Sequence, residues 1–360
     1  MRILSVTSVR NEAPYLLEWI AHHRGAGLTD FLIYSNDCDD GTDQMLSLLA
    51  DAGEVVHVPH VPEPDKSIQW QALRQAWKHP LRKVADWIMV TDVDEFLNIH
   101  VPGHQIPDLL GKVPTDTDAI IMPWRLYGNN ERVAIDDVSV TEQFIRCIPA
   151  EAQYPVAASL FKTLFRAKGP FNQLGVHRPK QKDPDKAGWP KMVDGSGQPV
   201  HPFLAKPPQR LSLYDLGVAR DLVELNHYAV RSAAAFVVKR DRGLPNRATK
   251  KVDLAYWVER NFNTEEDTSI AKMRPATERE LQRLLAIEGV AEAHAAGVRW
   301  HQERFQALIA QPEVQETMSQ ILCAGRSQPH PRASQRHVVT WHHLTNYQTA
   351  QPPRPEPPGQ

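Results

Sequence analysis

The sequence has few cysteines and no excess of charge of either sign. Its 360 residues include three cysteines, Cys38, Cys147 and Cys323, which are odd in number and widely separated. This pattern argues against a disulfide-held fold and against a cysteine-rich zinc site, and it favours a reducing compartment. The formal net charge of -2 gives no reason to expect broad binding to nucleic acid or to an anionic membrane.

Long hydrophobic runs are also lacking. No apolar stretch approaches the length of a transmembrane helix, and the first residues enter a strand pattern without the regions of a signal peptide. We therefore expect a cytoplasmic protein without a transmembrane segment. Attachment to the inner face of the membrane through a partner stays open.

Strand and helix patterns alternate along the first part of the chain. Apolar, β-branched runs predict strands at 3–8, 31–34, 55–58, 87–90 and 119–124, with helical patterns between the first four. This alternation is typical of an α/β fold with a helix-covered sheet. A further apolar run at 222–228 is followed by an expected helix at 232–238.

The later part of the chain has weaker patterns. Residues 246–325 are expected to form a helical appendage, in which Thr277 to Glu280 has the spacing of a capping box at a helix start. Residues 326–360 are rich in Pro, Gln, His and Ser, which predicts a mobile tail. The paired His22 and His23 are expected on a helix surface.

Asp92 and Asp94 come directly after the strand at 87–90. The same spacing recurs at 37–39, 116–118 and 183–185, but those pairs lie among turn-forming residues. Open α/β sheets bind ligands beyond the carboxyl ends of their strands. Two carboxylates there can ligate Mg²⁺ or Mn²⁺, and the ion can hold a diphosphate. We therefore expect Asp92 and Asp94 to be metal ligands, with Glu95 as a less certain neighbour.

Four segments together resemble the glycosyltransferase family 2-like superfamily, and most closely its bacterial branch with a GT-A fold. They are 10–19 (RNEAPYLLEW), 36–42 (NDCDDGT), 92–97 (DVDEFL) and 226–228 (NHY). The resemblance covers residues 1–245 and implies a Rossmann-like mixed sheet flanked by helices. The acid that relatives carry directly after the second strand is replaced here by Ser35, so that Asn36 or Asp37 would substitute for it.

The resemblance also implies roles for individual residues. It places a nucleotide pocket at Arg10, Asn11, Glu12, Asn36 and Asp37, and it assigns the cation to Asp92, Asp94 and His227. Cations that follow His227 could clamp the diphosphate; these are Lys239, Arg240 and Arg242. The loop after the strand at 119–124 would hold the acceptor sugar through Trp124, Arg125 and Tyr127, although core packing is an alternative for its aromatic residues.

No residue has decisive context as a catalytic base. If the reaction inverts the sugar carbon, an acid must take a proton from the acceptor hydroxyl, and the candidates are Glu142, Glu151, Asp183 and Asp185. His177 is a further site candidate. A retaining reaction would not need this base.

These features predict a metal-dependent glycosyltransferase that moves a hexosyl unit from a nucleotide sugar, with UDP-sugar as the expected donor, to a saccharide or glycolipid. Surface-polysaccharide assembly is the expected setting. Two alternatives remain open at this point. A haloacid-dehalogenase-like phosphohydrolase also carries Asp-x-Asp after an apolar strand, and a noncatalytic carbohydrate-binding protein could share the fold.

Overall fold

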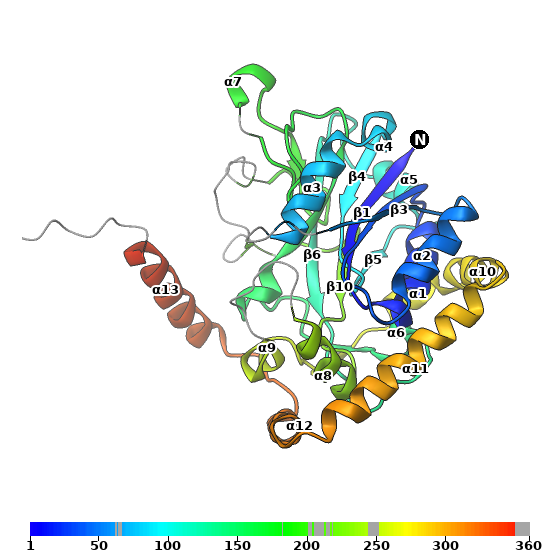
Figure 1. Cartoon of the computed structure of the whole chain (residues 1–360). Coiled ribbons are helices and arrows are strands. Elements are labelled where there is room, and N and C mark those ends of the chain that lie inside the picture. Colours follow the sequence, from blue (N-terminus) through cyan, green and yellow to red (C-terminus); the bar gives the residue numbers. More distant parts are fainter. Residues whose placement is uncertain are drawn as a thin grey trace, which may run out of the picture.

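The computed structural model describes most of the chain as a nine-stranded sheet with helices on both faces (Figure 1). Within the described residues, the strand order is β3-β2-β1-β4-β8-β6-β10-β5, and β9 pairs with β6. The predicted α/β class, with a mixed sheet flanked by helices, is confirmed. The described residues are 1–61, 63, 67–181, 183–200, 204, 212–213, 217, 219–243 and 252–349.

The first half of the sheet is parallel. Strand β1 pairs in parallel with β2 and β4, and β2 pairs with β3. The predicted strands and helices are found here within a few residues of the expected bounds. They are β1 (Ile3–Val9), α1 (Ala13–Gly25), β2 (Asp30–Ser35), α2 (Thr42–Asp51), β3 (Val56–Pro59), α3 (Ile68–Lys78) and β4 (Trp87–Val90). A short helix that was not predicted, α4 (Pro80–Val84), lies between α3 and β4.

Side-chain alternation along the central strands makes two hydrophobic layers. Ile3 and Met89 belong to one cluster with the residues of α1 and α2, whereas Leu4 and Ile88 belong to a second cluster with α3. Successive residues of a strand point to opposite faces, so strands that are apolar throughout are covered on both sides. Figure 1 shows α3 on one side of the sheet and α1 and α2 on the other.

The second half of the sheet is mixed. Strand β8 runs antiparallel to both β4 and β6, β10 is parallel to β6, and β5 is antiparallel to β10. The elements are β5 (Glu95–Ile99), α5 (Ile106–Leu110), β6 (Ala119–Leu126), α6 (Val140–Gln143), β7 (Arg146–Cys147), η1 (Val156–Ser159), β8 (Phe161–Arg166), α7 (Pro184–Ala187), β9 (Met192–Val193), β10 (Val223–His227) and α8 (Ala233–Arg242).

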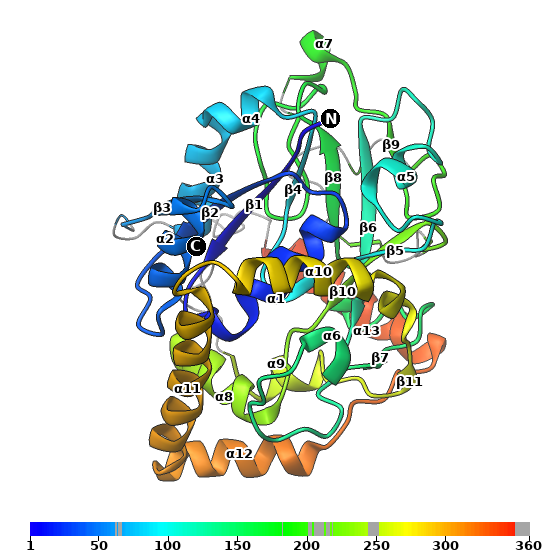
Figure 2. The same ribbon diagram turned by 90° about the vertical axis from the view of Figure 1, so that its right-hand side faces the viewer.

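The C-terminal helices pack on the sheet domain and share its core. Leu284, Val290 and Ile321 belong to the same hydrophobic cluster as α1 and α2, and Figure 2 shows α10 beside α1. His301 also lies 2.8 Å from a carboxylate oxygen of Asp40 in the loop after β2. The elements are α9 (Leu254–Val258), β11 (Glu265–Glu266), η3 (Ser269–Met273), α10 (Arg274–Leu285), α11 (Val290–Ile309), α12 (Pro312–Ala324) and α13 (Arg332–Thr349).

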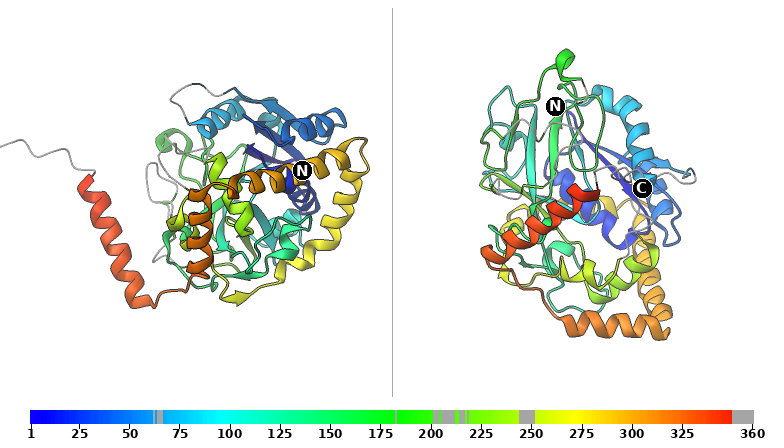
Figure 3. Two further views of the ribbon diagram at one scale, coloured as in Figure 1. Left: turned by 60° about the horizontal axis from the view of Figure 1, so that its bottom comes forward. Right: turned by 90° about the vertical axis from the view of Figure 1, so that its left-hand side faces the viewer.

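Two local predictions differ from the structure, and a third stays a prediction. Helix α10 begins at Arg274 with Pro275 in its first turn, so Thr277 lies inside the helix and is no cap. The segment expected as a mobile tail contains helix α13, which lies at the margin of the fold (Figure 3). Its mobility stays a prediction, and residues 350–360 lie outside the described residues. His22 and His23 are buried, because the face of α1 that carries them packs against Phe96.

None of the helices that the structure describes is both long enough and apolar enough to cross a membrane.

Candidate active site

A cavity of about 290 Å³ lies where β1, β2 and β4 end. The predicted site residues that line it are Arg10, Glu12, Asn36, Asp92, Asp94, Trp124, His177, His227, Lys239 and Arg242. Its other described lining residues are Ser8, Ile68, Val93, Leu160, Val176, Gly243, Tyr256 and Arg260. Segments far apart in the sequence therefore meet at the carboxyl edge of the parallel strands, where α/β folds bind ligands.

The turn after β4 is held by a buried acid and a buried lysine. Glu95 accepts hydrogen bonds at Oε2 from the Thr91 hydroxyl (2.9 Å) and from the Asp92 backbone N–H (3.0 Å). Lys162 Nζ reaches both Asp92 Oδ2 (2.9 Å) and Glu95 Oε2 (3.2 Å) from the neighbouring strand β8. Glu95 thus shapes the loop that presents Asp92, and it is not among the residues that line the cavity.

These contacts set the protonation of the turn. Burial raises the pKa of Glu95 to about 8, and the charges of Asp92 and Asp94 act in the same direction, while Lys162 opposes the shift. Burial disfavours the charged form of Lys162 as well, but Asp92 and Glu95 outweigh it and raise the pKa of this lysine. Lys162 is therefore charged and forms an ion pair with Asp92 from the interior of the sheet.

Asp94 is buried beside two groups that favour its charge. Lys239 Nζ donates to Asp94 Oδ2 (2.8 Å), and His227 Nε2 lies 3.6 Å from Asp94 Oδ1. Burial alone would raise the pKa of Asp94, but Lys239 and His227 outweigh it and hold the pKa well below its usual range. Burial lowers the pKa of His227, while the nearby carboxylate of Asp94 acts in the opposite direction.

Glu12 anchors the cationic side of the cavity. Its carboxylate lies 2.9 Å from Arg231 Nη1 and 2.5 Å from Arg242 Nη2. Burial opposes the charge of Glu12, but the two arginines lower its pKa nevertheless. Arg10 donates to the backbone carbonyls of Asp37 (3.3 Å) and Arg242 (3.1 Å), and thereby connects the loops after β1 and β2 to the end of α8.

Asn11 and Asp37 shape the backbone of these loops. Both have left-handed backbones, with φ of 49° and 46°, a conformation that Asn and Asp tolerate better than most residues. Asn11 Oδ1 accepts a hydrogen bond from the Asp39 backbone N–H (2.8 Å). Neither side chain is among the described lining residues of the cavity, although each directly precedes or follows one that is.

Trp124 and two histidines form an aromatic wall. The ring centroids of Trp124 and His227 are 4.1 Å apart, and those of Trp124 and His177 are 5.4 Å apart. The buried indole N–H of Trp124 has no hydrogen-bond partner among the described residues. The Trp124 side chain is part of the cavity lining, and an aromatic face there is suited to stack on a sugar.

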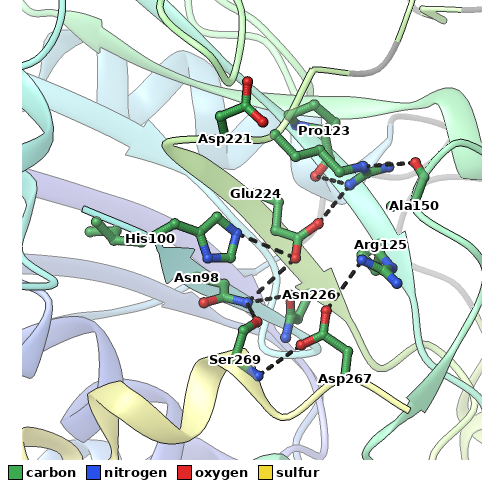
Figure 4. Close-up of polar contacts among 12 residues, drawn as sticks. Asn98, His100, Pro123, Arg125, Ala150, Asp221, Glu224, Asn226, Asp267 and Ser269 are labelled. Carbon is green, nitrogen blue, oxygen red and sulfur yellow. Dashed lines mark hydrogen bonds and ion pairs between the residues drawn. The ribbon is translucent and has the colours of Figure 1, made fainter. Parts of the chain in front are cut away.

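Arg125 and Tyr127 point to the opposite face of β6. Arg125 forms ion pairs with Glu265 (3.0 Å) and Asp267 (3.2 Å), and the fully buried Tyr127 accepts a hydrogen bond from Asn226 (2.9 Å). Figure 4 shows Arg125 with Asp267, close to Asn226. Because side chains alternate along a strand, Trp124 faces the cavity and Arg125 does not. The predicted acceptor contacts are thus brought to the cavity only at Trp124.

Other predicted residues also lie outside the cavity lining. Arg240 donates a hydrogen bond to Thr317 of α12. Glu142 pairs with Arg274 at 2.9 Å, and Asp183 pairs with Lys186 at 3.2 Å. Glu151 borders a separate cavity beside the start of α13, and Asp185 lies in the short helix α7. None of the four acids predicted as bases lines the cavity that contains Asp92 and Asp94.

Sequence reasoning did not identify several residues of the site. Lys162 could have been identified from the sequence, because a lysine inside the largely apolar run 161–165 needs a buried partner. Arg231 carries no comparable signal, yet it pairs with Glu12 and covers the ring of Tyr15 at 3.5 Å. Tyr256 and Arg260 come from α9 and the residues just after it, far along the chain.

The class of protein follows from comparison of this sequence with known families. The sequence profile of glycosyltransferase family 92 matches residues 4–187, just over half of the chain. The chain therefore belongs to glycosyltransferase family 92. The expected resemblance to glycosyltransferases is confirmed, but the family 2 branch is corrected to family 92. The expectation was based on short motifs at one edge of the sheet. Motifs of this length do not distinguish one glycosyltransferase family from a related one.

Related proteins match over short segments. A family 92 glycosyltransferase protein of Oryza sativa subsp. japonica is 32% identical over 102 residues, and one of Arabidopsis thaliana is 31% identical over 109 residues. These matches cover 28% and 29% of this chain, but only 16% and 18% of the relatives' lengths. The relatives are plant proteins, so they lend no support to the expected bacterial branch.

Solved structures of low similarity complete the comparison. A mannosyltransferase from Pyrobaculum calidifontis in complex with GDP-Man and Mn²⁺ is 14% identical, with a TM-score of 0.31, over 90% of this chain and 85% of its own. Glucosyl-3-phosphoglycerate synthase from Mycobacterium tuberculosis, with Mn²⁺ and UDP, is 16% identical, with a TM-score of 0.30, over 60% and 74%. These values are too low to transfer residue roles.

Proposed function

We propose that this chain transfers a hexosyl unit from a nucleotide sugar, with UDP-sugar as the first candidate, to a hydroxyl of a saccharide or glycolipid. The observation that carries the proposal is the cavity in which the Asp92–Asp94 turn faces Lys239, Arg242 and the aromatic wall. Membership of family 92 supports the same class of reaction. That membership also leaves the phosphohydrolase alternative without support.

The residues of the cavity fit a divalent cation that the donor helps to hold. Asp94 Oδ1 and His227 Nε2 lie 3.6 Å apart on the cavity wall, close enough for both to bind one ion. Within the described residues, no group of three or more His, Cys, Asp and Glu is placed to hold a metal. Two protein ligands suffice where the substrate's diphosphate and water complete the shell, as is usual for Mg²⁺.

The chain's own residues act on the leaving nucleoside diphosphate. A bound Mn²⁺ or Mg²⁺ would stabilise the negative charge that develops on this group. Lys239 and Arg242 line the cavity beside Asp94 and Glu12. From there, the two cationic side chains can donate hydrogen bonds to the diphosphate oxygens. Lys162 keeps Asp92 oriented toward the cavity from beneath. Asp92 is then available to contact the nucleotide or the ion.

The acceptor and the cellular setting belong to the proposal as well. Trp124 is the described residue best suited to stack on an acceptor or donor sugar, since its ring lies in the cavity wall. Surface-polysaccharide assembly, a cytoplasmic location and attachment to the inner face of the membrane stay predictions.

The proposal is tested by incubating the purified full chain with a panel of UDP-sugars and GDP-mannose in the presence of Mn²⁺. Release of nucleoside diphosphate, by transfer or by slow hydrolysis, is expected for at least one donor. Asp94→Asn should reduce this release by about a hundredfold or more, because charge stabilisation at the leaving group is lost. Asp116→Asn is the matched control, since Asp116 has the same spacing but lies exposed on another loop.

Two results would contradict the proposal. Release at the wild-type rate by Asp94→Asn would remove the role of this turn. No release from any donor, together with tight binding of a saccharide that needs neither metal nor nucleotide, would favour the noncatalytic carbohydrate-binding alternative.

A further inference from the structure

The carboxylates in the wall of the cavity are already engaged by cations. Asp92 pairs with Lys162 at 2.9 Å, Asp94 pairs with Lys239 at 2.8 Å, and Glu12 pairs with Arg231 and Arg242. An ion-paired carboxylate is a poor proton acceptor, because protonation would leave its cationic partner without a counter-charge. None of these three acids is therefore suited to take a proton from an acceptor hydroxyl.

His177 differs from them because its ring is fixed by neutral partners. Its Nδ1 lies 2.9 Å from the Phe161 carbonyl oxygen. A carbonyl can only accept a hydrogen bond, so Nδ1 carries the proton and Nε2 has the free lone pair. The His177 backbone carbonyl also accepts a hydrogen bond from the Thr163 hydroxyl at 2.8 Å. Strand β8 thus fixes the ring, its tautomer and its place in the cavity wall.

The surroundings of His177 place it beside the predicted sugar surface. Its ring centroid is 5.4 Å from that of Trp124, which in turn lies 4.1 Å from that of His227. A sugar held against the Trp124 ring would therefore lie near both His177 and His227. Among the described histidines and acids that line the cavity, His177 is the one that forms no ion pair with another described residue.

We propose that His177 is a catalytic residue of the transfer, which accepts the proton of the attacking hydroxyl at Nε2; this inference rests on the proposed function. The hydroxyl oxygen forms the new bond to the anomeric carbon. The bond from that carbon to the phosphate oxygen breaks, and its electron pair leaves with the nucleoside diphosphate. The proton moves from the hydroxyl to Nε2. A single displacement of this kind inverts the anomeric configuration.

The basicity of the ring is suited to this step. Burial lowers the pKa of His177 to about 4, and the nearby Lys162 acts in the same direction. The imidazole is therefore neutral in neutral solution and has roughly the basicity of an ordinary carboxylate, with a pKa of about 4. A base of this strength takes the proton late, as the forming bond makes the hydroxyl acidic.

The test measures hydrolysis of whichever sugar nucleotide the wild-type chain turns over, with water as acceptor and Mn²⁺ present. His177→Ala and His177→Gln are each expected to lower kcat by about 10²–10⁴-fold, the usual contribution of a positioned base. Stabilisation of the folded chain by UDP and Mn²⁺ should stay at the wild-type level, which shows that each variant folds. Added imidazole should restore activity to His177→Ala but not to His177→Gln, whose side chain fills the space.

His104→Ala is the matched control. His104 Nδ1 also lies 2.7 Å from a backbone carbonyl oxygen, that of Ile99, but His104 is not among the residues that line the cavity. This variant should hydrolyse the donor at the wild-type rate.

The outcomes separate this inference from the function on which it rests. If the wild-type chain is active and His177→Ala retains activity within about tenfold, the role of His177 is contradicted. Absence of imidazole rescue, or retention of the anomeric configuration in the released sugar, contradicts it as well. If the wild-type chain turns over no donor, the proposed function fails first, and the inference fails with it.

Discussion

Lys162 Nζ lies 2.9 Å from Asp92 Oδ2, and the lysine side chain is fully buried in strand β8. The same ammonium group lies 3.2 Å from Glu95, which has no exposed surface. A buried lysine between two acids links the sheet interior to the turn that presents Asp92 and Asp94. This contact connects the stability of the fold to the geometry of the candidate active site.

Replacing Lys162 with Met should therefore destabilise the protein. The variant leaves Asp92 without its cation and removes a hydrogen-bond donor from the buried carboxyl of Glu95, so a cost of roughly 1–3 kcal/mol is expected. Urea unfolding measures this change. Lys191→Met is the control, because the Lys191–Asp116 pair is exposed and its loss should change the free energy of unfolding very little. Equal effects of the two substitutions would contradict the structural role of Lys162.

The two faces of β6 predict opposite effects of neighbouring substitutions. Trp124→Ala should raise KM for a saccharide acceptor by about tenfold, the amount expected for loss of one aromatic contact. Tyr127→Phe should leave transfer unchanged and lower the free energy of unfolding by about 1 kcal/mol, because Asn226 loses its hydrogen-bond acceptor. The acceptor KM from steady-state kinetics distinguishes the two variants, because urea unfolding should show a loss of stability for Trp124→Ala as well, whose ring is buried in the core. A large change in KM for Tyr127→Phe would place the acceptor on the other face.

The buried histidines of α1 predict that stability falls in acid. Burial lowers the pKa of His22 from 6.5 to about 4 and that of His23 to about 3. Below about pH 6.5 the unfolded chain binds protons that the folded chain does not bind. The contribution of these histidines to the free energy of unfolding is therefore fully present above about pH 6.5 and decreases as the pH falls toward 4. For His22 alone the loss at pH 4 is on the order of 3 kcal/mol.

The variant His23→Phe should reduce this pH dependence. Its ring can keep the contacts with Trp19 and Phe96, and it has no proton to bind. Urea unfolding between pH 7 and pH 4.5 compares the variant with the wild type. An identical slope of stability against pH in both proteins would show that His23 does not contribute.

The sequence predicts the first half of the fold well because its signals are local. The strands β1, β2 and β4 are apolar runs, and their carboxyl ends must meet in a parallel sheet, so the sequence brings Arg10, Asn36 and Asp92 together. The register of β6 with β8 and β10 determines which of Trp124 and Arg125 points into the cavity. Local sequence patterns do not determine this register.

Long-range contacts explain the remaining differences. His22 and His23 are polar residues whose burial follows from the packing of Phe96 and α10, which lie far along the chain. Lys162 acquires its role only when β8 inserts between β4 and β6. The order of strands in a mixed sheet depends on such pairings, and helical or strand periodicity carries no information about it.

The most direct test of the candidate active site is thermal unfolding of the full chain with UDP, with and without Mn²⁺. A ligand that binds only the folded chain raises the unfolding midpoint by mass action. The wild-type chain and Asp116→Asn should be stabilised by several degrees by UDP with Mn²⁺, and much less by UDP alone, whereas Asp94→Asn should show little added effect of the metal. Equal stabilisation of Asp94→Asn and the wild type by UDP with Mn²⁺ would contradict a metal-assisted nucleotide site at Asp94 and His227.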